Sequence, residues 1–214
     1  MPGKLTYFPL GGRSEPIRSL LYLAKFDYED NRIVPTDWPN IQPSTPMGSL
    51  PLWEEDGIVM CQNNAILRTL GIRVGYYSED PQICYNIDSL LDFFEDGIPL
   101  YVPYSFKGVA GFPTDDSDLE KWNNFWPKYT KVLEDRLAAH KKNFAAGTDS
   151  LTIADLKIWH CMILILEQPD NPTPQEQKDY ARAEIAKCPN LTAYLDRLRQ
   201  AMSAWMQARV PTPY

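Results

Sequence analysis

The chain has 214 residues, a length that fits one large domain or two small ones and can bury a sizeable core. Apolar residues make up 44% of it and charged residues 23%, which is typical of folded soluble proteins and excludes a disordered or fibrous chain. The 28 acidic residues outnumber the 21 basic ones, and no run of Lys or Arg could follow a phosphate backbone. We therefore expect no nucleic-acid partner, and an anion bound by this acidic chain must be held by a local cluster of donors.

The first third of the chain carries alternating strand and helix signals. Residues 4–8 form a short β-like run that ends at the Gly11-Gly12 pair. Ser14-Glu15-Pro16 then combines a capping hydroxyl with an early proline, and apolar side chains follow at helical spacing. We expect an amphipathic helix here, followed by a weaker strand near residues 28–34.

A hairpin and a second helix come next. Residues 51–53 and 58–60 flank Asp56-Gly57, which is a strong hairpin signal. Gln62-Asn63-Asn64 is expected to cap a helix that continues through residue 70. The elements therefore follow in the order β-α-β and then β-β-α.

Strand signals then end, and helical periodicity replaces them. Apolar side chains recur every three or four positions over residues 119–137, and again over residues 191–205, where one last helix is expected. Thr152 to Asp155 has capping-box spacing, with Asp where Glu or Gln is usual. We therefore expect an α/β domain over residues 1–78 and an all-α domain over residues 82–214.

The sequence is expected to belong to a cytoplasmic protein. It shows no basic region followed by a long apolar stretch near its start, and no apolar run approaches a membrane span. Its four cysteines are widely spaced without a CxxC pair, and only His140 and His160 accompany them. Reduced thiols are favoured over a disulfide framework or a metal site, and no metal is expected.

Six short motifs follow one another along the chain. They are Tyr7-Phe8-Pro9, Gly12-Arg13, Glu15-Pro16-Ile17-Arg18, Leu50-Pro51, Gln62 to Arg68, and Thr152 to Asp155. In order and spacing they resemble the motifs of the tyrosine-type cytosolic glutathione transferases, closest to the pi and sigma classes. The resemblance implies a thioredoxin-like domain joined to an α-helical domain, usually in a homodimer. It also implies a detoxification enzyme that transfers glutathione, its co-substrate, to hydrophobic electrophiles without a further cofactor.

By this resemblance Tyr7, at the end of the first strand, is the catalytic residue. Its hydroxyl would donate a hydrogen bond to the glutathione sulfur and favour the thiolate over the thiol. Taken alone, Tyr7 would be an ordinary half-buried tyrosine of a strand. The ordered set of motifs is what favours the catalytic role.

The resemblance places the γ-glutamyl end of glutathione at Gln62 and Asn63, where a strand turns into a helix. The free N–H groups and positive end of that helix would face a carboxylate, which is compatible with helix capping. The family usually has Ser in place of Asn63, so weaker but retained binding is expected. Arg13 would lie near the same end. Asp96 matches an acid that approaches the γ-glutamyl amine from the neighbouring subunit.

The rest of glutathione is assigned to four further residues. Leu50-Pro51 resembles the family's cis-proline turn, where the backbone of the residue before proline pairs with the cysteinyl backbone. A trans proline at the start of an edge strand stays open. Trp38 would reach the glycyl end. The family's lysine at the glycyl carboxylate has no clear counterpart, and Gln42 is the nearest match.

The candidates for the electrophile pocket are apolar and aromatic. They are Phe8, Leu10, Tyr104 and Phe106. A cluster of this kind is also typical of plain core, so the assignment depends on the resemblance.

Three rival interpretations of these residues remain. A redox relative would need a cysteine near the start of the first helix, and residues 9–14 contain none. A serine-type transferase would use Ser14, which is better explained as a helix cap. A non-enzymatic structural or ligand-carrier protein with the glutathione-transferase fold stays open, because Asn63 and the missing lysine depart from the family pattern.

Overall fold

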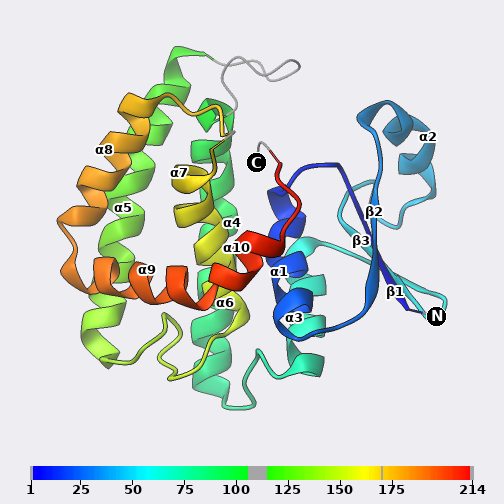
Figure 1. Cartoon of the computed structure of the whole chain (residues 1–214), viewed down its shortest axis with the longest axis horizontal. Helices are drawn as coiled ribbons and strands as arrows, with labels where there is room; N and C mark the ends of the chain where they lie inside the picture. The colour runs from blue at the N-terminus through cyan, green and yellow to red at the C-terminus, as the bar shows by residue number, and fades with distance from the viewer. Residues whose placement is uncertain (1, 106–114, 170, 213–214) are drawn as a thin grey trace.

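A computed structural model describes residues 2–105, 115–169 and 171–212 of the chain. Within these ranges the strands lie in the first third and helices dominate the rest (Figure 1). The N-terminal elements are β1 (Gly3–Tyr7), η1 (Gly12–Ser14), α1 (Glu15–Leu23), β2 (Tyr28–Arg32), η2 (Pro35–Asp37), α2 (Trp38–Ile41), η3 (Gln42–Ser44), β3 (Leu52–Glu55), β4 (Ile58–Cys61) and α3 (Asn63–Val74).

The four strands form one mixed sheet in the order β2-β1-β3-β4. β1 pairs parallel with β2 and antiparallel with β3, and β4 completes an antiparallel hairpin with β3. Asp56 and Gly57 have φ values of +49° and +79°, as a two-residue hairpin turn needs, so the predicted hairpin is confirmed. Helices α1 and α3 lie between this sheet and the helical half of the molecule (Figure 1). The arrangement is the expected β-α-β, β-β-α order of a thioredoxin-like domain.

Both N-terminal helices form where they are predicted, but neither has the expected side-chain cap. The Ser14 hydroxyl donates to the carbonyl oxygen of Gly11 at 2.9 Å, and Ser14 makes no capping hydrogen bond. Its backbone is already helical, because η1 leads directly into α1. Gln62, in front of α3, has a φ of +73° and also makes no capping hydrogen bond with its side chain. The prediction of polar side-chain caps at these two helices is therefore wrong.

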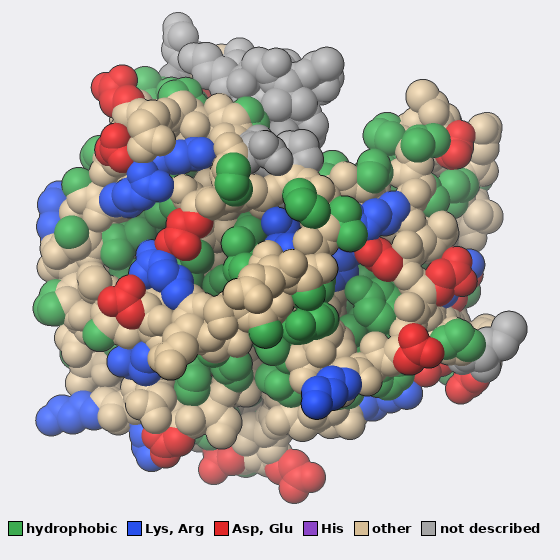
Figure 2. Space-filling view, in the orientation of Figure 1, with side chains coloured by type: hydrophobic (Ala, Val, Ile, Leu, Met, Phe, Trp, Pro, Cys, Tyr) green, Lys and Arg blue, Asp and Glu red, His purple; other side chains and the backbone are tan. Residues whose placement is uncertain are grey.

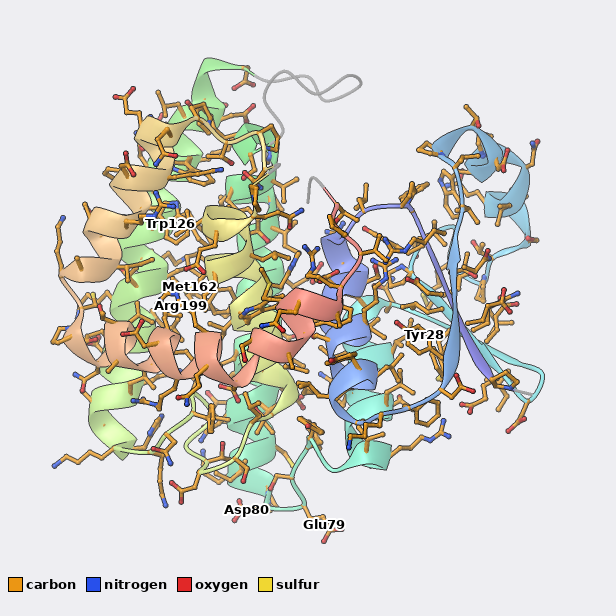
Figure 3. The ribbon with its side chains drawn as sticks, in the orientation of Figure 1. Tyr28, Glu79, Asp80, Trp126, Met162 and Arg199 are labelled. Atoms are coloured by element: carbon orange, nitrogen blue, oxygen red, sulfur yellow. The ribbon has the colours of Figure 1, made fainter. Side chains whose placement is uncertain are left out.

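The chain enters the helical half at Glu79 and Asp80, which are labelled in Figure 3. Asp80 Oδ1 accepts hydrogen bonds from the backbone N–H groups of Gln82 and Ile83 at 2.8 and 3.2 Å, and so caps the next helix. The helical elements are α4 (Pro81–Ser105), α5 (Asp116–His140), α6 (Ile153–Ile158), the π-helical η4 (Trp159–Leu164), α7 (Ile165–Glu167), α8 (Gln175–Ala186), α9 (Pro189–Ala201) and α10 (Ser203–Ala208).

Helix α5 continues through Pro127. A proline inside a helix leaves the carbonyl four residues earlier without its usual donor, and here that carbonyl belongs to Asn123. The hydroxyl of Tyr180 from α8 donates to the Asn123 oxygen at 3.0 Å. A neighbouring helix therefore satisfies the group that the proline leaves open.

The predicted helix start at Thr152 is confirmed. The backbone N–H and the hydroxyl of Thr152 donate to Asp155 Oδ2 at 2.8 and 2.9 Å. The other oxygen of Asp155 accepts from the N–H of Ala145 at 3.1 Å and from the hydroxyl of Tyr194 at 2.7 Å. This buried carboxyl group thus joins the start of α6 to the preceding loop and to α9, which is a role in folding.

The single helix expected over residues 191–205 is in fact two helices. The helical geometry is interrupted at Met202, between α9 and α10. Helix α10 then lies beside α1 (Figure 1), where the indole N–H of Trp205 donates to Glu15 Oε1 at 3.1 Å. Arg209 Nε donates to the same oxygen at 2.8 Å. The break allows the end of the chain to pack onto the N-terminal half.

The predicted architecture, an α/β domain followed by an all-α domain, is confirmed, whereas the boundaries at residues 78 and 82 stay predictions. Among the residues that the structure describes, no helix combines the length and apolar character needed to cross a membrane. On the face seen in Figure 2, Lys and Arg side chains are mixed with Asp and Glu rather than gathered in one patch.

Candidate active site

Tyr7 lies at the end of β1, where the strand enters the loop that leads to α1. Its side chain is buried, and its hydroxyl oxygen accepts a hydrogen bond from the backbone N–H of Arg13 at 3.3 Å. Gly12 has a φ of +46°, and a Cβ added there would lie 2.8 Å from the Tyr7 oxygen. Glycine at this position therefore permits both the backbone conformation and the close approach of the loop to the phenol.

The environment of Tyr7 keeps its hydroxyl protonated. Burial raises the pKa of Tyr7, and the backbone N–H of Arg13 and the positive charges of Arg13 and Arg18 only partly oppose this rise. A phenol with a raised pKa remains a hydrogen-bond donor at neutral pH. It can therefore stabilise an anion such as a thiolate.

Arg18 fixes the loop beside Tyr7 from inside the protein. Its Nη1 donates to the carbonyl oxygen of Leu10 at 2.7 Å, and its Nε donates to Asp30 Oδ1 at 3.1 Å. Its guanidinium also lies 6.0 Å from the centre of the Tyr7 ring. The side chain is almost completely buried, so the loop is held by a charge that solvent does not screen.

A charged cluster lies next to this loop, at the contact between the two halves of the chain. Its centre is Glu95 of α4, whose Oε1 accepts from Arg13 Nε at 2.8 Å. Glu95 Oε2 accepts from Asn63 Nδ2 at 3.0 Å and from Lys157 Nζ at 2.6 Å. The four residues come from η1, α3, α4 and α6, so the cluster exists only in the folded chain.

Glu95 is ionised throughout the neutral range. Burial alone would raise its pKa, but the ammonium of Lys157 and the hydrogen bonds from Arg13 and Asn63 outweigh that effect and lower the pKa to about 2. The cluster at neutral pH therefore consists of two cations, one carboxylate and one amide.

Two residues of this cluster, Glu95 and Lys157, are absent from the sequence-based assignment. Asp96, which the resemblance assigns to the neighbouring subunit's site, is exposed on α4 and lies outside the cluster around Glu95. Consecutive helical residues point about 100° apart, so Glu95 can contact Arg13 while Asp96 points in a different direction. The signal for Lys157 is a lysine among the apolar residues Leu156 and Ile158 of a helix expected to be buried, since a buried lysine needs a partner.

The residues assigned to the glycyl end lie on the loop that includes α2 and η3. Trp38 is half-buried, and its ring meets the ring of Phe8 edge to face at 6.0 Å. Gln42 is exposed, and its Nε2 donates to the carbonyl oxygen of Gly48 at 3.1 Å. Gln62, which is assigned to the γ-glutamyl end, is also exposed, and its Nε2 lies 3.7 Å from the sulfur of Met47. The structure thus links Trp38 to the strand end that carries Tyr7.

The peptide bond between Leu50 and Pro51 is cis, one of the two states that the sequence left open. Pro51 is buried and Leu50 is half-buried, directly before β3. These two residues therefore lie between the loop of Gln42 and the sheet.

The candidates for the electrophile pocket occupy different environments. Phe8 and Leu10 are half-buried on the loop after β1. Tyr104, near the end of α4, is buried with its ring 5.7 Å from that of Trp122 of α5. Phe106 lies outside the described residues.

Cys61, Cys84, Cys161 and Cys188 are free thiols. In the described part of the chain, no group of three or more His, Cys, Asp or Glu side chains is arranged to hold a metal ion.

Comparison with known proteins gives the family. Residues 108–209 match the model of the glutathione S-transferase C-terminal domain. The chain is 32% identical to glutathione S-transferase 1 of Ascaris suum, over 99% of this chain and 98% of the relative. It is also 32% identical to hematopoietic prostaglandin D synthase of Gallus gallus, over 98% and 97% of the two chains.

The solved structures agree. Na-GST-3 of the hookworm Necator americanus, described as a monomeric glutathione S-transferase, superimposes with a TM-score of 0.83 at 27% identity, and the match covers 100% of both chains. Full-length identity above 30% to a glutathione S-transferase, together with this fold and the matching C-terminal domain, shows that the chain belongs to the glutathione S-transferase family.

Proposed function

We propose that this protein is a glutathione transferase of the tyrosine type, close to the pi and sigma classes, and that Tyr7 activates the glutathione thiol for attack on hydrophobic electrophiles. The observation that supports this most directly is the buried Tyr7 hydroxyl. It lies within a loop held by Arg18 and next to the backbone of Arg13. Such a hydroxyl is fixed in position and protonated at neutral pH.

Tyr7 acts on the sulfur by donating a hydrogen bond to the thiolate. A thiol with a pKa of ~8.5 is only about 3% ionised at pH 7, so complete ionisation increases the nucleophile about 30-fold at most. A less basic sulfur is also intrinsically less reactive. The remaining rate enhancement comes from holding an electrophile in line with the sulfur.

Glutathione is bound along the loop and helix ends around Tyr7. Arg13, Gln62 and Asn63 receive the γ-glutamyl end, a role supported for Arg13 and Asn63 by their shared contact with Glu95. The backbone of Leu50 and Pro51 pairs with the cysteinyl part. Trp38 and Gln42 take the glycyl end. The electrophile lies against Phe8, Leu10, Tyr104 and Phe106.

We also infer that the protein is a cytoplasmic homodimer. Asp96 then approaches the γ-glutamyl amine of the neighbouring subunit's site, and its exposure on α4 leaves it available for that contact. Because one relative is named a prostaglandin D synthase, synthesis of a prostaglandin is a second reaction that the same site could support.

The test combines binding with turnover. The full chain is passed over immobilised glutathione, eluted with free glutathione, and assayed for conjugation of an aryl halide and for synthesis of prostaglandin D. Retention with turnover supports the proposal. Retention without turnover of either substrate would favour the non-enzymatic carrier, and failure to bind glutathione would exclude the proposed site.

A further inference from the structure

Lys157 is a buried cation whose role the glutathione contacts proposed above do not include. Its side chain is only 1% exposed, and every residue of its helix, α6, is buried. Burying an ammonium group among apolar residues is costly unless a counter-charge lies close by. The counter-charge here is Glu95, whose Oε2 lies 2.6 Å from Lys157 Nζ.

The same carboxylate also faces Arg13. Arg13 Nε binds Glu95 Oε1, so the two oxygens of Glu95 are divided between two cations. With Arg13 and Glu95 alone the cluster would be neutral. Lys157 changes this balance and gives the cluster one net positive charge, within a chain whose overall charge is −7.

This charge lies close to the proposed ligand. Asn63 Nδ2 and Lys157 Nζ bind the same oxygen of Glu95, at 3.0 and 2.6 Å. Lys157 is therefore separated by one carboxylate from a side chain that is proposed to contact the γ-glutamyl end. At such separations, in a partly buried site, a unit charge changes the binding of an anion severalfold or more.

We propose that Lys157 is a positioning residue for glutathione: its charge offsets Glu95, so that Arg13 presents a net positive charge to the α-carboxylate of the γ-glutamyl end. This inference rests on the proposed function, because it needs glutathione to bind at Arg13 and Asn63. It adds a charge preference: ligands that keep this carboxylate are bound, and ligands in which it is neutral are selected against.

A purely structural role for Lys157 predicts something different. The ion pair also joins α4 to α6, and its loss could disturb the site through packing alone. A packing defect would weaken the binding of glutathione and of a neutral analogue by similar factors. The loss of a charge would weaken the binding of glutathione alone.

The experiment measures calorimetric affinity for glutathione and for its analogue with the γ-glutamyl α-carboxylate converted to an amide. Wild-type protein should prefer glutathione by about tenfold or more. Lys157→Met should bind glutathione about tenfold more weakly and the amide nearly as well as wild type, so most of the preference disappears. The double variant Lys157→Met/Glu95→Gln removes one charge of each sign and should regain most of the affinity and preference.

Lys178→Met is the matched control. Lys178 is also a buried lysine of the helical half, with its Nζ on the carbonyl oxygen of Asn171 at 3.0 Å. Its replacement should leave both affinities unchanged.

The inference is overturned if Lys157→Met keeps the wild-type preference for glutathione over the amide, or if the double variant lacks that preference. In either case the proposed function stands. If Lys157→Met does not fold, the double variant decides, since it leaves no buried charge of this cluster unpaired: Arg13, which loses its partner, is partly exposed. Wild-type protein that binds no glutathione overturns both the inference and the proposed function.

Discussion

Glu15 and Arg209 are 194 positions apart in the sequence and form a buried ion pair, with Arg209 Nε 2.8 Å from Glu15 Oε1. Arg209 also donates to Gln168 Oε1 at 3.2 Å and to the hydroxyl of Thr212 at 3.2 Å. The second oxygen of Glu15 lies 3.9 Å from Arg18, which holds the loop beside Tyr7. The last described residues of the chain are thus connected to the candidate active site.

Replacing Arg209 by Met should lower the free energy of unfolding by about 3 kcal/mol, because it leaves the buried carboxylate of Glu15 without its main counter-charge. Urea unfolding at neutral pH measures this loss. Lys131→Met, which breaks the exposed pair with Asp135, is the control and should cost well under about 1 kcal/mol. Equal unfolding midpoints for Arg209→Met and wild type would contradict the role given to the pair.

Tyr7→Phe should reduce kcat/KM for conjugation by roughly ten- to a hundredfold, since a hydrogen bond to a charged partner contributes about 1.5–3 kcal/mol. The ring stays in place, so glutathione affinity should change little. The ultraviolet absorbance of the bound thiolate, titrated against pH, should show a higher thiol pKa in the variant. A pH profile identical to that of wild type would remove Tyr7 from the mechanism.

Ser14→Ala separates the tyrosine-type from the serine-type mechanism. The Ser14 hydroxyl is bound to the carbonyl of Gly11, so its removal should leave the thiol pKa unchanged and affect mainly the loop. Loss of turnover in Ser14→Ala with full turnover in Tyr7→Phe would instead favour the serine-type enzyme.

Local chemistry made much of the fold predictable. The Asp56-Gly57 hairpin and the start of α6 at Thr152 depend on residues close together in the sequence, so their signals are visible there. The prediction of side-chain caps at Ser14 and Gln62 is wrong because the preceding turns set a different backbone conformation at each residue. Ser14 is already helical, and Gln62 has a positive φ. Local signals thus predict the existence of a helix or strand better than they predict the hydrogen bonds at its first residues.

Contacts between distant segments could not be predicted in the same way. Whether Glu95 or Asp96 faces the loop of Arg13 depends on the rotation of α4 about its axis, which the packing of the whole helical half determines. Lys157 reaches Glu95 across 62 positions, and the break at Met202 matters only because α1 lies where α10 can pack. These relationships need the tertiary structure.

Asp96→Asn tests the proposed contribution of a second subunit. The variant should raise the KM for glutathione more than it lowers kcat, because the contact is to a part of the substrate that does not react. Glu95→Gln is the matched comparison. Because Glu95 contacts residues of its own chain, the effect of this variant on the KM for glutathione should be the same in a monomer and in a dimer. Sedimentation velocity should show a dimer at micromolar concentration. A monomer with unimpaired glutathione binding would contradict the shared site.

Gln42→Lys should strengthen glutathione binding severalfold by placing a cation near the glycyl carboxylate. A charge-assisted hydrogen bond is roughly twice as strong as a neutral one, which corresponds to a gain on the order of 1 kcal/mol. The gain should shrink at high salt because Gln42 is exposed, and it should vanish for glutathione esterified at the glycyl carboxylate. Unchanged affinity in Gln42→Lys, together with complete loss in Trp38→Ala, would show that Trp38 and backbone donors hold this end.

The protein should lose stability as the pH falls from about 6.5, and His160 is the main reason. Burial, together with the positive charges of Lys157 and Arg209, lowers the pKa of His160 to about 3 against the opposing effect of Glu95. The unfolded chain therefore binds a proton at this histidine below about pH 6.5 while the folded chain does not, so protonation favours unfolding. Glu95 adds to the loss only below about pH 4.5, because its folded pKa is about 2.

Between about pH 6.5 and 4.5, proton uptake by His160 therefore favours unfolding, whereas Asp155, whose pKa is raised by burial, changes stability in the opposite direction. The contribution of His160 to the free energy of unfolding should fall by up to ~1.4 kcal/mol per pH unit there. Urea unfolding at several pH values measures the slope, and His160→Gln, which cannot take up a proton, should flatten it. His140→Gln removes the other histidine of the chain and should retain the slope. If both variants kept the wild-type slope, the acid sensitivity would have to come from a group other than His160.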